Sequence, residues 1–128
     1  MKRIFFTALL MVSLPAAAEN WVRYAQSDDV SRYYDKERVL LMSGTAFIWD
    51  LHDLRAETAG IDGKPHRSVT YATEVNCRKE QVRVLSYQQM AGSMGAGPMV
   101  AEHSLVGDWK SPSQQSAESR LMMIACEQ

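Results

Sequence analysis

The sequence predicts an α+β domain: an antiparallel sheet of about six strands with one C-terminal helix packed on a face. Between Trp21 and Leu105, short runs alternate apolar with polar residues, which is the period of half-buried strands. After Ser116 the apolar spacing changes to three and four residues, which is the period of an amphipathic helix. The two cysteines, Cys77 and Cys126, fall in a strand run and in the predicted helix. A disulfide between them would tether the helix to the sheet.

The first 18 residues have the pattern of a Sec signal peptide. Lys2 and Arg3 form a positive start, residues 4–14 are an uncharged, largely apolar run, and residues 15–18 (PAAA) supply a small-residue cleavage site. The run is shorter than the ~20 apolar residues that cross a bilayer. We therefore expect cleavage after Ala18 and an exported chain with no membrane span. Glu19 stands where a bacterial lipoprotein has its lipid-bearing cysteine.

The charge balance argues against nucleic acid as a partner. The whole chain has a formal charge of −1, and without Lys2 and Arg3 it keeps 12 basic against 15 acidic residues, a net charge of −3. Neutralising phosphates requires a surplus of basic residues. The remaining residues 19–128 have the size and composition of one globular domain.

The cysteines predict a structural disulfide. In an oxidising compartment Cys77 and Cys126 have only one intramolecular pairing, and a small exported domain benefits from such a link. The alternatives are a metal pair or a redox pair. Both prefer close spacing such as C-x-x-C, whereas these two cysteines are far apart in the sequence.

The strand pattern predicts which residues face the core. Strands are expected over 21–26, 32–35, 45–54, 69–77, 81–88 and 99–105, with a separate apolar stretch over 39–42. In the run 45–54 the alternation predicts that Phe47, Trp49 and Leu51 are buried. In the run 69–77 it places the odd positions, including Cys77, in the core. Only residues 78–80 separate this strand from the next, which predicts a hairpin.

The segment 91–98 contains three glycines in eight residues. A phosphate-binding loop would need a following helix with free N-terminal amides, usually with a lysine, and the sequence shows neither. The segment is therefore interpreted as a flexible hairpin loop.

The C-terminal pattern predicts a helix that starts near Ser116. Ser113 or Ser116 is the expected N-cap, and Glu118 favours the helix start electrostatically. The apolar stripe consists of Ala117, Leu121, Ile124 and Ala125, and Cys126 lies at its edge.

No residue set predicts catalysis. The three histidines, His52, His66 and His103, are far apart, so only the fold could assemble them into a metal or haem site. Asp50 and His52 share one face of their strand, with Asp53 on the other, and a polar outer face explains this pattern. The sequence has no nucleophile motif. We therefore expect no enzyme activity, no catalytic or metal-binding residues and no cofactor.

Several motifs follow one another in a characteristic order: Trp21, Tyr33-Tyr34-Asp35, Phe47-Ile48-Trp49-Asp50-Leu51, Glu74-Val75-Asn76-Cys77, Met94-Gly95-Ala96-Gly97, Trp109, Ser116 and Ala125-Cys126. In this order the chain resembles the surface-adhesin protein E family over nearly all of its length after the signal peptide. The resemblance implies a six-stranded antiparallel sheet with a C-terminal helix tethered by one disulfide, the architecture that the residue patterns also predict.

The resemblance also implies a function. One member of the family is a dimeric surface lipoprotein of a respiratory pathogen that attaches to vitronectin and laminin and has been linked to haem binding. For this chain, the resemblance implies an exported, non-enzymatic module of a Gram-negative bacterium that binds extracellular-matrix or cell-surface proteins. It also implies that the protein forms a homodimer. The contact would be made by the sheet edge, an exposed sheet face or the glycine loop. The matching residues serve packing, turns and the disulfide, so they identify no ligand-binding residues.

Two alternatives stay open. The first is a soluble periplasmic protein with a structural or stress-related role, whose partners are envelope proteins. Glu19, in place of a lipoprotein cysteine, favours it. The second is binding of a small ligand such as haem between the helix and the sheet.

Overall fold

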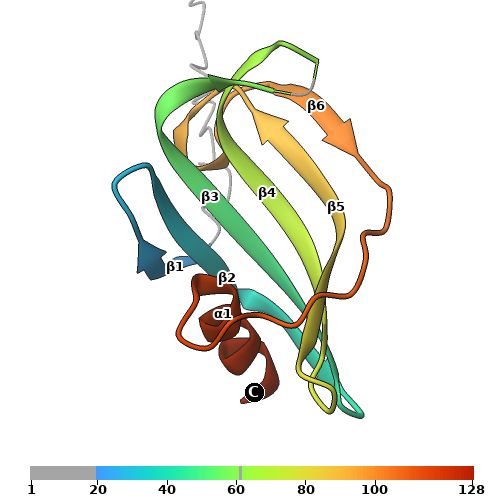
Figure 1. The fold of residues 1–128 in the computed structure, drawn as a ribbon. Helices are drawn as coiled ribbons and strands as arrows, with labels where there is room; N and C mark the ends of the chain where they lie inside the picture. Colours follow the sequence, from blue (N-terminus) through green and yellow to red (C-terminus); the bar gives the residue numbers. More distant parts are fainter. Residues whose placement is uncertain (1–19, 61) are drawn as a thin grey trace, which may run out of the picture.

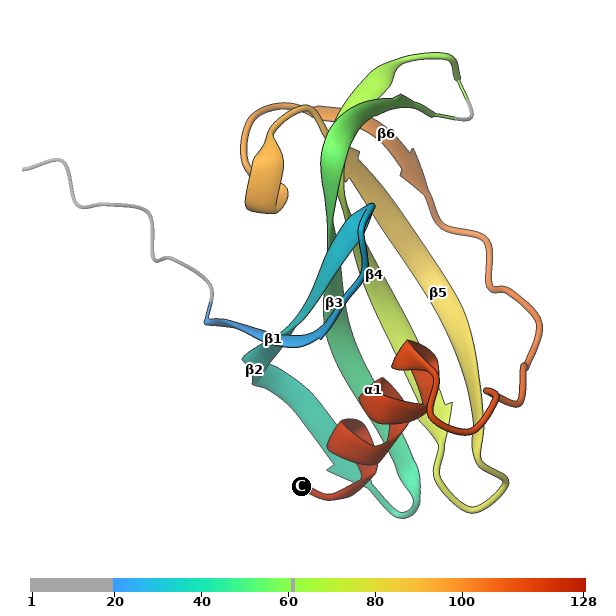
Figure 2. The same cartoon turned by 60° about the vertical axis from the view of Figure 1, so that its left-hand side comes forward.

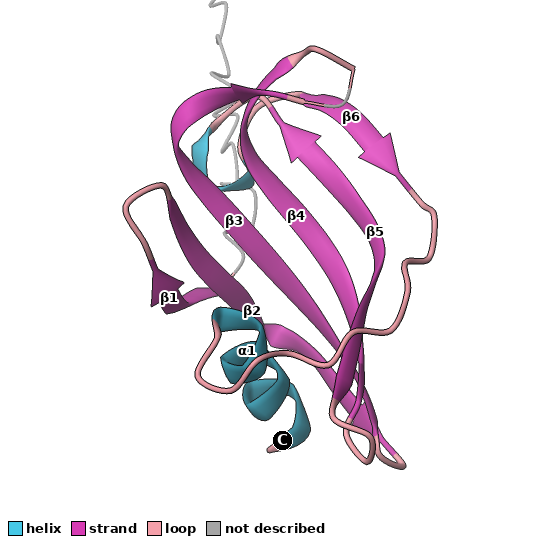
Figure 3. Ribbon diagram, in the orientation of Figure 1, coloured by secondary structure: helices cyan, strands magenta, loops and turns pink. Residues whose placement is uncertain are grey.

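The computed structural model describes residues 20–60 and 62–128, so the predicted signal peptide lies outside the described residues. The elements follow the chain in Figure 1 and Figure 3 as β1 (Trp21–Gln26), β2 (Val30–Met42), β3 (Thr45–Ala59), β4 (Pro65–Asn76), β5 (Gln81–Met90), η1 (Ser93–Gly95), β6 (Met99–His103) and α1 (Ala117–Cys126). The six strands form one sheet in sequence order, and each pairs antiparallel with the next. The predicted fold class is confirmed.

The β2 strand joins two segments that the sequence analysis treated separately. Its pairing with β3 shifts register between Tyr34 and Val39, which marks an irregularity of the β-bulge kind. Asp35 lies there, is 3% exposed, and accepts a hydrogen bond from the Glu37 backbone amide at 2.9 Å. The polar residues 35–38 interrupt the strand alternation in the sequence, and they coincide with this irregularity.

The α1 helix covers one side of the sheet, which we call the helix face, and leaves the other side as the open face (Figure 1). The core on the helix face consists of Tyr24, Ala46, Ile48, Val75, Leu121 and Ala125. The odd positions of β4 lie on this face, as predicted. The prediction for β3 is confirmed for Leu51, which is 0% exposed, and is wrong for Phe47 and Trp49, which are only partly buried; the buried residues beneath α1 are the even positions Ala46, Ile48 and Asp50. The sequence pattern favoured the face with Phe47 and Trp49, because these two residues are large and aromatic. A carboxylate at position 50 is typical of an exposed position.

The predicted start and anchoring of α1 are confirmed. Ser116 is the N-cap, and its hydroxyl accepts a hydrogen bond from the Ser119 backbone amide at 3.1 Å. Glu118 lies in the first turn, where a negative charge is favourable. Cys77 and Cys126 form the disulfide, with their Cα atoms 5.9 Å apart. The disulfide fixes the C-terminal end of α1 at the start of the β4–β5 turn.

The glycine segment packs on the open face at the opposite end of the sheet (Figure 2). The Asp53 carboxylate accepts hydrogen bonds from the Ser93 hydroxyl at 2.7 Å and from the Met94 backbone amide at 2.8 Å. The Ser68 hydroxyl accepts from the Gly95 amide and donates to the Gly92 carbonyl. The predicted hairpin around this segment is confirmed, because β5 and β6 pair antiparallel. These hydrogen bonds place its loop against the sheet, and the expected flexibility of the loop stays a prediction.

Breaking the disulfide should loosen α1. The link closes a loop of about 50 residues, which contributes roughly 4 kcal/mol in the chain-entropy model. For a domain of this size, Cys77→Ser or Cys126→Ser should lower the melting temperature by roughly 15 °C. Calorimetry of each variant, with reduced wild type as the control, measures this effect. A melting curve that overlays that of the oxidised wild type would show that the link is not structural.

Candidate functional site

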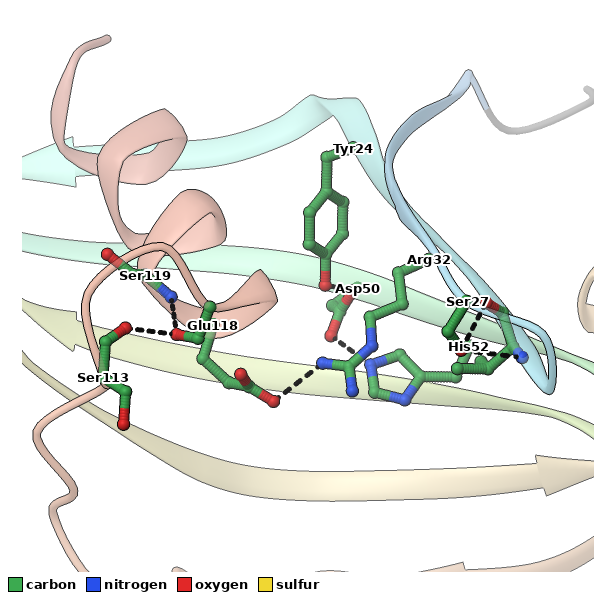
Figure 4. Close-up of polar contacts among 10 residues, drawn as sticks. Tyr24, Ser27, Arg32, Asp50, His52, Ser113, Glu118 and Ser119 are labelled. Carbon is green, nitrogen blue, oxygen red and sulfur yellow. Dashed lines mark hydrogen bonds and ion pairs between the residues drawn. The ribbon is translucent and has the colours of Figure 1, made fainter.

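A polar cluster lies on the helix face beside the N-terminal end of α1 (Figure 4). Asp50, on β3, is 4% exposed. Its Oδ1 accepts a hydrogen bond from the Tyr24 hydroxyl at 2.7 Å, and its Oδ2 lies 2.9 Å from His52 Nε2. Burial and the neighbouring Asp50 charge raise the pKa of Tyr24, so the phenol stays neutral and donates.

An ion pair connects this cluster to α1. Arg32 Nη1, on β2, lies 2.8 Å from Glu118 Oε1 in the first turn of the helix. The hydrogen bond from Arg32 lowers the pKa of Glu118 and outweighs the opposing effect of burial. Arg120 also donates to the Tyr24 carbonyl at 2.8 Å. The N-terminal half of α1 is therefore held to the sheet by polar contacts, and its C-terminal end by the disulfide.

A ladder of aromatic and imidazole rings crosses the helix face. His52, Tyr71, Tyr87 and His103 lie on β3, β4, β5 and β6, with successive ring centroids 4.6, 5.8 and 5.2 Å apart. Tyr71 is directly opposite both Asp50 and Tyr87 in the strand register. Burial raises the pKa of Tyr71, and the charge of Asp50 and the neighbouring Tyr87 add to this effect. These three effects all disfavour ionisation of the Tyr71 phenol.

The segment from Ser104 to Ser116, which we call the strap, runs along β5 and then crosses the sheet to α1 (Figure 1). The Gly107 amide donates to the Val84 carbonyl at 2.8 Å, and Val82 and Lys110 exchange two backbone hydrogen bonds of 2.8 Å. A cavity of about 560 Å³ lies between the strap, α1 and the sheet. Its lining includes Asp50, His52, Tyr71, Ser113 and Glu118. The volume falls within the roughly 300–1,000 Å³ typical of small-molecule sites.

The structure separates the histidines that the sequence analysis considered together. His52 lies in the polar cluster, His103 stacks on Tyr87, and His66 is buried near the start of β4. Within residues 20–60 and 62–128, no three His, Cys, Asp or Glu side chains come together in a way that could hold a metal ion.

The interpretation of Asp50 and His52 as part of a polar outer face is wrong. Asp50 is buried, and His52 lines the cavity beneath the strap. Asp53 does lie on the opposite side, as expected, where it binds the glycine loop. Sequence reasoning also missed Tyr24, Arg32 and Glu118 as partners in one site. No local signal could have found them, because their contacts join residues 26 to 96 positions apart.

Comparison with known protein families shows to which family the chain belongs. The sequence model of the family described as "Surface-adhesin protein E" matches residues 21–127, nearly all of the described chain. The chain belongs to the surface-adhesin protein E family. Membership implies a non-enzymatic role at the cell surface or outside the cell. No curated protein sequence matches the chain.

Solved structures of Haemophilus influenzae protein E have the same fold. One superimposes with a TM-score of 0.68 at 15% sequence identity, covering 84% of each chain. A second crystal form gives 0.69 at 14% identity, covering 84% of this chain and 87% of that one. Protein E from non-typeable Haemophilus influenzae gives 0.60 at 14% identity, covering 90% of this chain and 79% of that one. At these identities the likeness shows the fold alone.

A search of the described helices for membrane spans finds none that is long and apolar enough to cross a bilayer.

The ion pair between Arg32 and Glu118 should make stability depend on acidity. The folded-state pKa of Glu118 is lowered. The stabilisation that the ion pair gives the folded state is therefore complete above the ordinary pKa of a glutamate, about 4.3, and is lost as pH falls through the lowered value. Glu118→Gln should therefore be less stable than wild type at pH 7, by less than about 1 kcal/mol because Glu118 is half exposed. The difference should shrink towards pH 3.

Urea unfolding at both pH values measures the effect of Glu118→Gln. The matched control is Glu57→Gln, at an exposed position near the end of β3, which should leave stability unchanged. A Glu118→Gln protein as stable as wild type at pH 7, or a difference that stays constant between the two pH values, would contradict the role of this ion pair.

Proposed function

We propose that the protein is an exported adhesin-like module that binds a protein of the extracellular matrix or cell surface. The observation that carries this proposal is the family match, which spans the whole domain rather than one motif. On the open face, the side of the sheet away from the cavity, the described surface has a region suited to contact with another protein.

The open face carries apolar and aromatic side chains that α1 does not cover. Leu40 and Met42, on β2, are 51% and 55% exposed, and the neighbouring Phe47 and Trp49 on β3 are only partly buried. Leu40 pairs with Phe47 in the strand register, so the two side chains lie on the same side of the sheet. A group of large exposed apolar residues on one sheet face is typical of a protein contact surface.

Two tryptophans on this side each have an arginine against the ring. The Arg38 guanidinium lies 5.3 Å from the Trp49 ring centroid, and that of Arg83 lies 4.3 Å from the Trp109 centroid. The Glu74 carboxylate holds Arg83 in place at 2.9 Å. Tryptophan and arginine are enriched among the residues that dominate protein–protein binding energies, and rings fixed in this way lose little entropy on binding. We assign the partner contact to this face, with Trp49 and Trp109 as anchors.

Replacing the anchors should weaken adhesion without unfolding the domain. Trp49→Ala and Trp109→Ala should each raise the dissociation constant by about tenfold or more, because each removes a large contact surface. Biolayer interferometry on immobilised vitronectin and laminin measures this change. Met123→Ala, at a 54% exposed position on α1, is the matched control and should bind like wild type. Equal affinity of all three variants would exclude the open face.

Location tests the proposal independently. Protease added to intact cells should remove the protein, or the protein should be found in the medium, because an adhesin must meet its partner outside the cell. A periplasmic protein of known location serves as the control for cell integrity. Full protection within the periplasm would overturn host adhesion and favour an envelope partner.

A further inference from the structure

We propose that the cavity beneath the strap binds a small neutral saccharide of one or two sugar units. This site lies on the helix face, whereas the proposed protein contact lies on the open face. The proposal therefore goes beyond adhesion and does not depend on it.

The first argument is the charge balance of the lining. Residues of both signs line the cavity, Arg32, Arg83 and Lys110 together with Asp50, Asp108 and Glu118, although the Arg83 guanidinium itself packs on Trp109 on the open face. An anionic ligand would require a surplus of donors, and a cationic ligand a surplus of acceptors. The lining has no large surplus of either, so a ligand without net charge suits it best.

The second argument is that several of the charged groups already have partners within the protein. Arg32 pairs with Glu118 at 2.8 Å, and Arg83 pairs with Glu74 at 2.9 Å. The Asp50 carboxylate accepts a hydrogen bond from the Tyr24 hydroxyl and lies within hydrogen-bond distance of His52 Nε2. A charged ligand that bound Arg32, Glu118 or Asp50 would have to compete with these contacts. A sugar hydroxyl would not, because it can use the remaining lone pairs of a carboxylate and the remaining N–H groups of an arginine.

The third argument is that hydroxyl and apolar groups are both present. Hydroxyls of Tyr71, Thr73, Ser111 and Ser113 line the cavity together with Val82, Val84, Pro112 and Leu121. A sugar hydroxyl donates one hydrogen bond and accepts others, so it fits a wall that mixes donors, acceptors and hydroxyls. The C–H faces of a sugar ring can pack on the apolar side chains. The volume of about 560 Å³ accommodates a ligand of this size.

Titration of the ¹⁵N-labelled protein with neutral disaccharides tests the assignment. The probes are lactose, maltose, cellobiose and N,N′-diacetylchitobiose, with inorganic phosphate and spermidine as charged comparisons. At least one sugar should give saturable amide shifts at millimolar concentration, concentrated at Tyr71, Val84 and the strap. The charged probes should give none at these positions. No saturable shift with any sugar, or saturable shifts only with a charged probe, would overturn the proposal.

A matched pair of strap variants locates the binding. Ser113→Trp places an indole at the lining of the cavity, whereas Ser104→Trp places one on an exposed part of the strap outside it. Binding should weaken at least about tenfold in Ser113→Trp and stay unchanged in Ser104→Trp. Both variants are compared by melting temperature, because their positions are exposed and neither substitution should unfold the protein. Equal sugar affinity in the two variants would overturn the assignment to this cavity.

Discussion

The attachment of α1 to one face of the sheet is the constraint on which the rest of the structure depends. A helix of ten residues is too short to be stable alone in water. It is held because Leu121 and Ala125 are buried against the sheet and the disulfide fixes its C-terminal end. With that end fixed, the first turn lies over β2 and β3, where Arg32 can pair with Glu118. The strap must then cross the helix face to reach the start of α1, and this crossing forms one wall of the cavity.

The buried Asp50 carboxylate is compatible with this arrangement because both of its oxygens have partners. Burying an unpaired charge costs several kcal/mol, whereas a carboxylate that accepts two hydrogen bonds recovers much of that cost. Tyr24 and His52 supply these bonds from β1 and β3. Three strands and the helix therefore meet around one polar cluster, which orients the side chains that line the cavity.

Most of the fold could be predicted from the sequence, because its strongest signals are local. Strand alternation, the change of period after Ser116 and the single pair of cysteines predicted the sheet, the helix and the disulfide. The face of β3 could not be predicted, because Asp50 and His52 interrupt the apolar pattern on the buried side, while Trp49 strengthens it on the open side. The docking of the glycine loop was missed for a similar reason, since Asp53 and Ser68 are distant from it in sequence. The cluster around Asp50 depends on contacts across three strands, and no spacing rule encodes these.

The two faces of the sheet have opposite character, and this difference argues for separate roles. On the helix face, polar groups such as Asp50 and His52 are paired in a partly open cavity, which suits a ligand small enough to enter beneath the strap. On the open face, Leu40 and Met42 are exposed and Trp49 and Trp109 carry arginines against their rings, which suits a broad contact with another protein. Strand alternation produces this division directly, since neighbouring residues such as Trp49 and Asp50 point to opposite sides. A substitution on one face can therefore change one contact and leave the other intact.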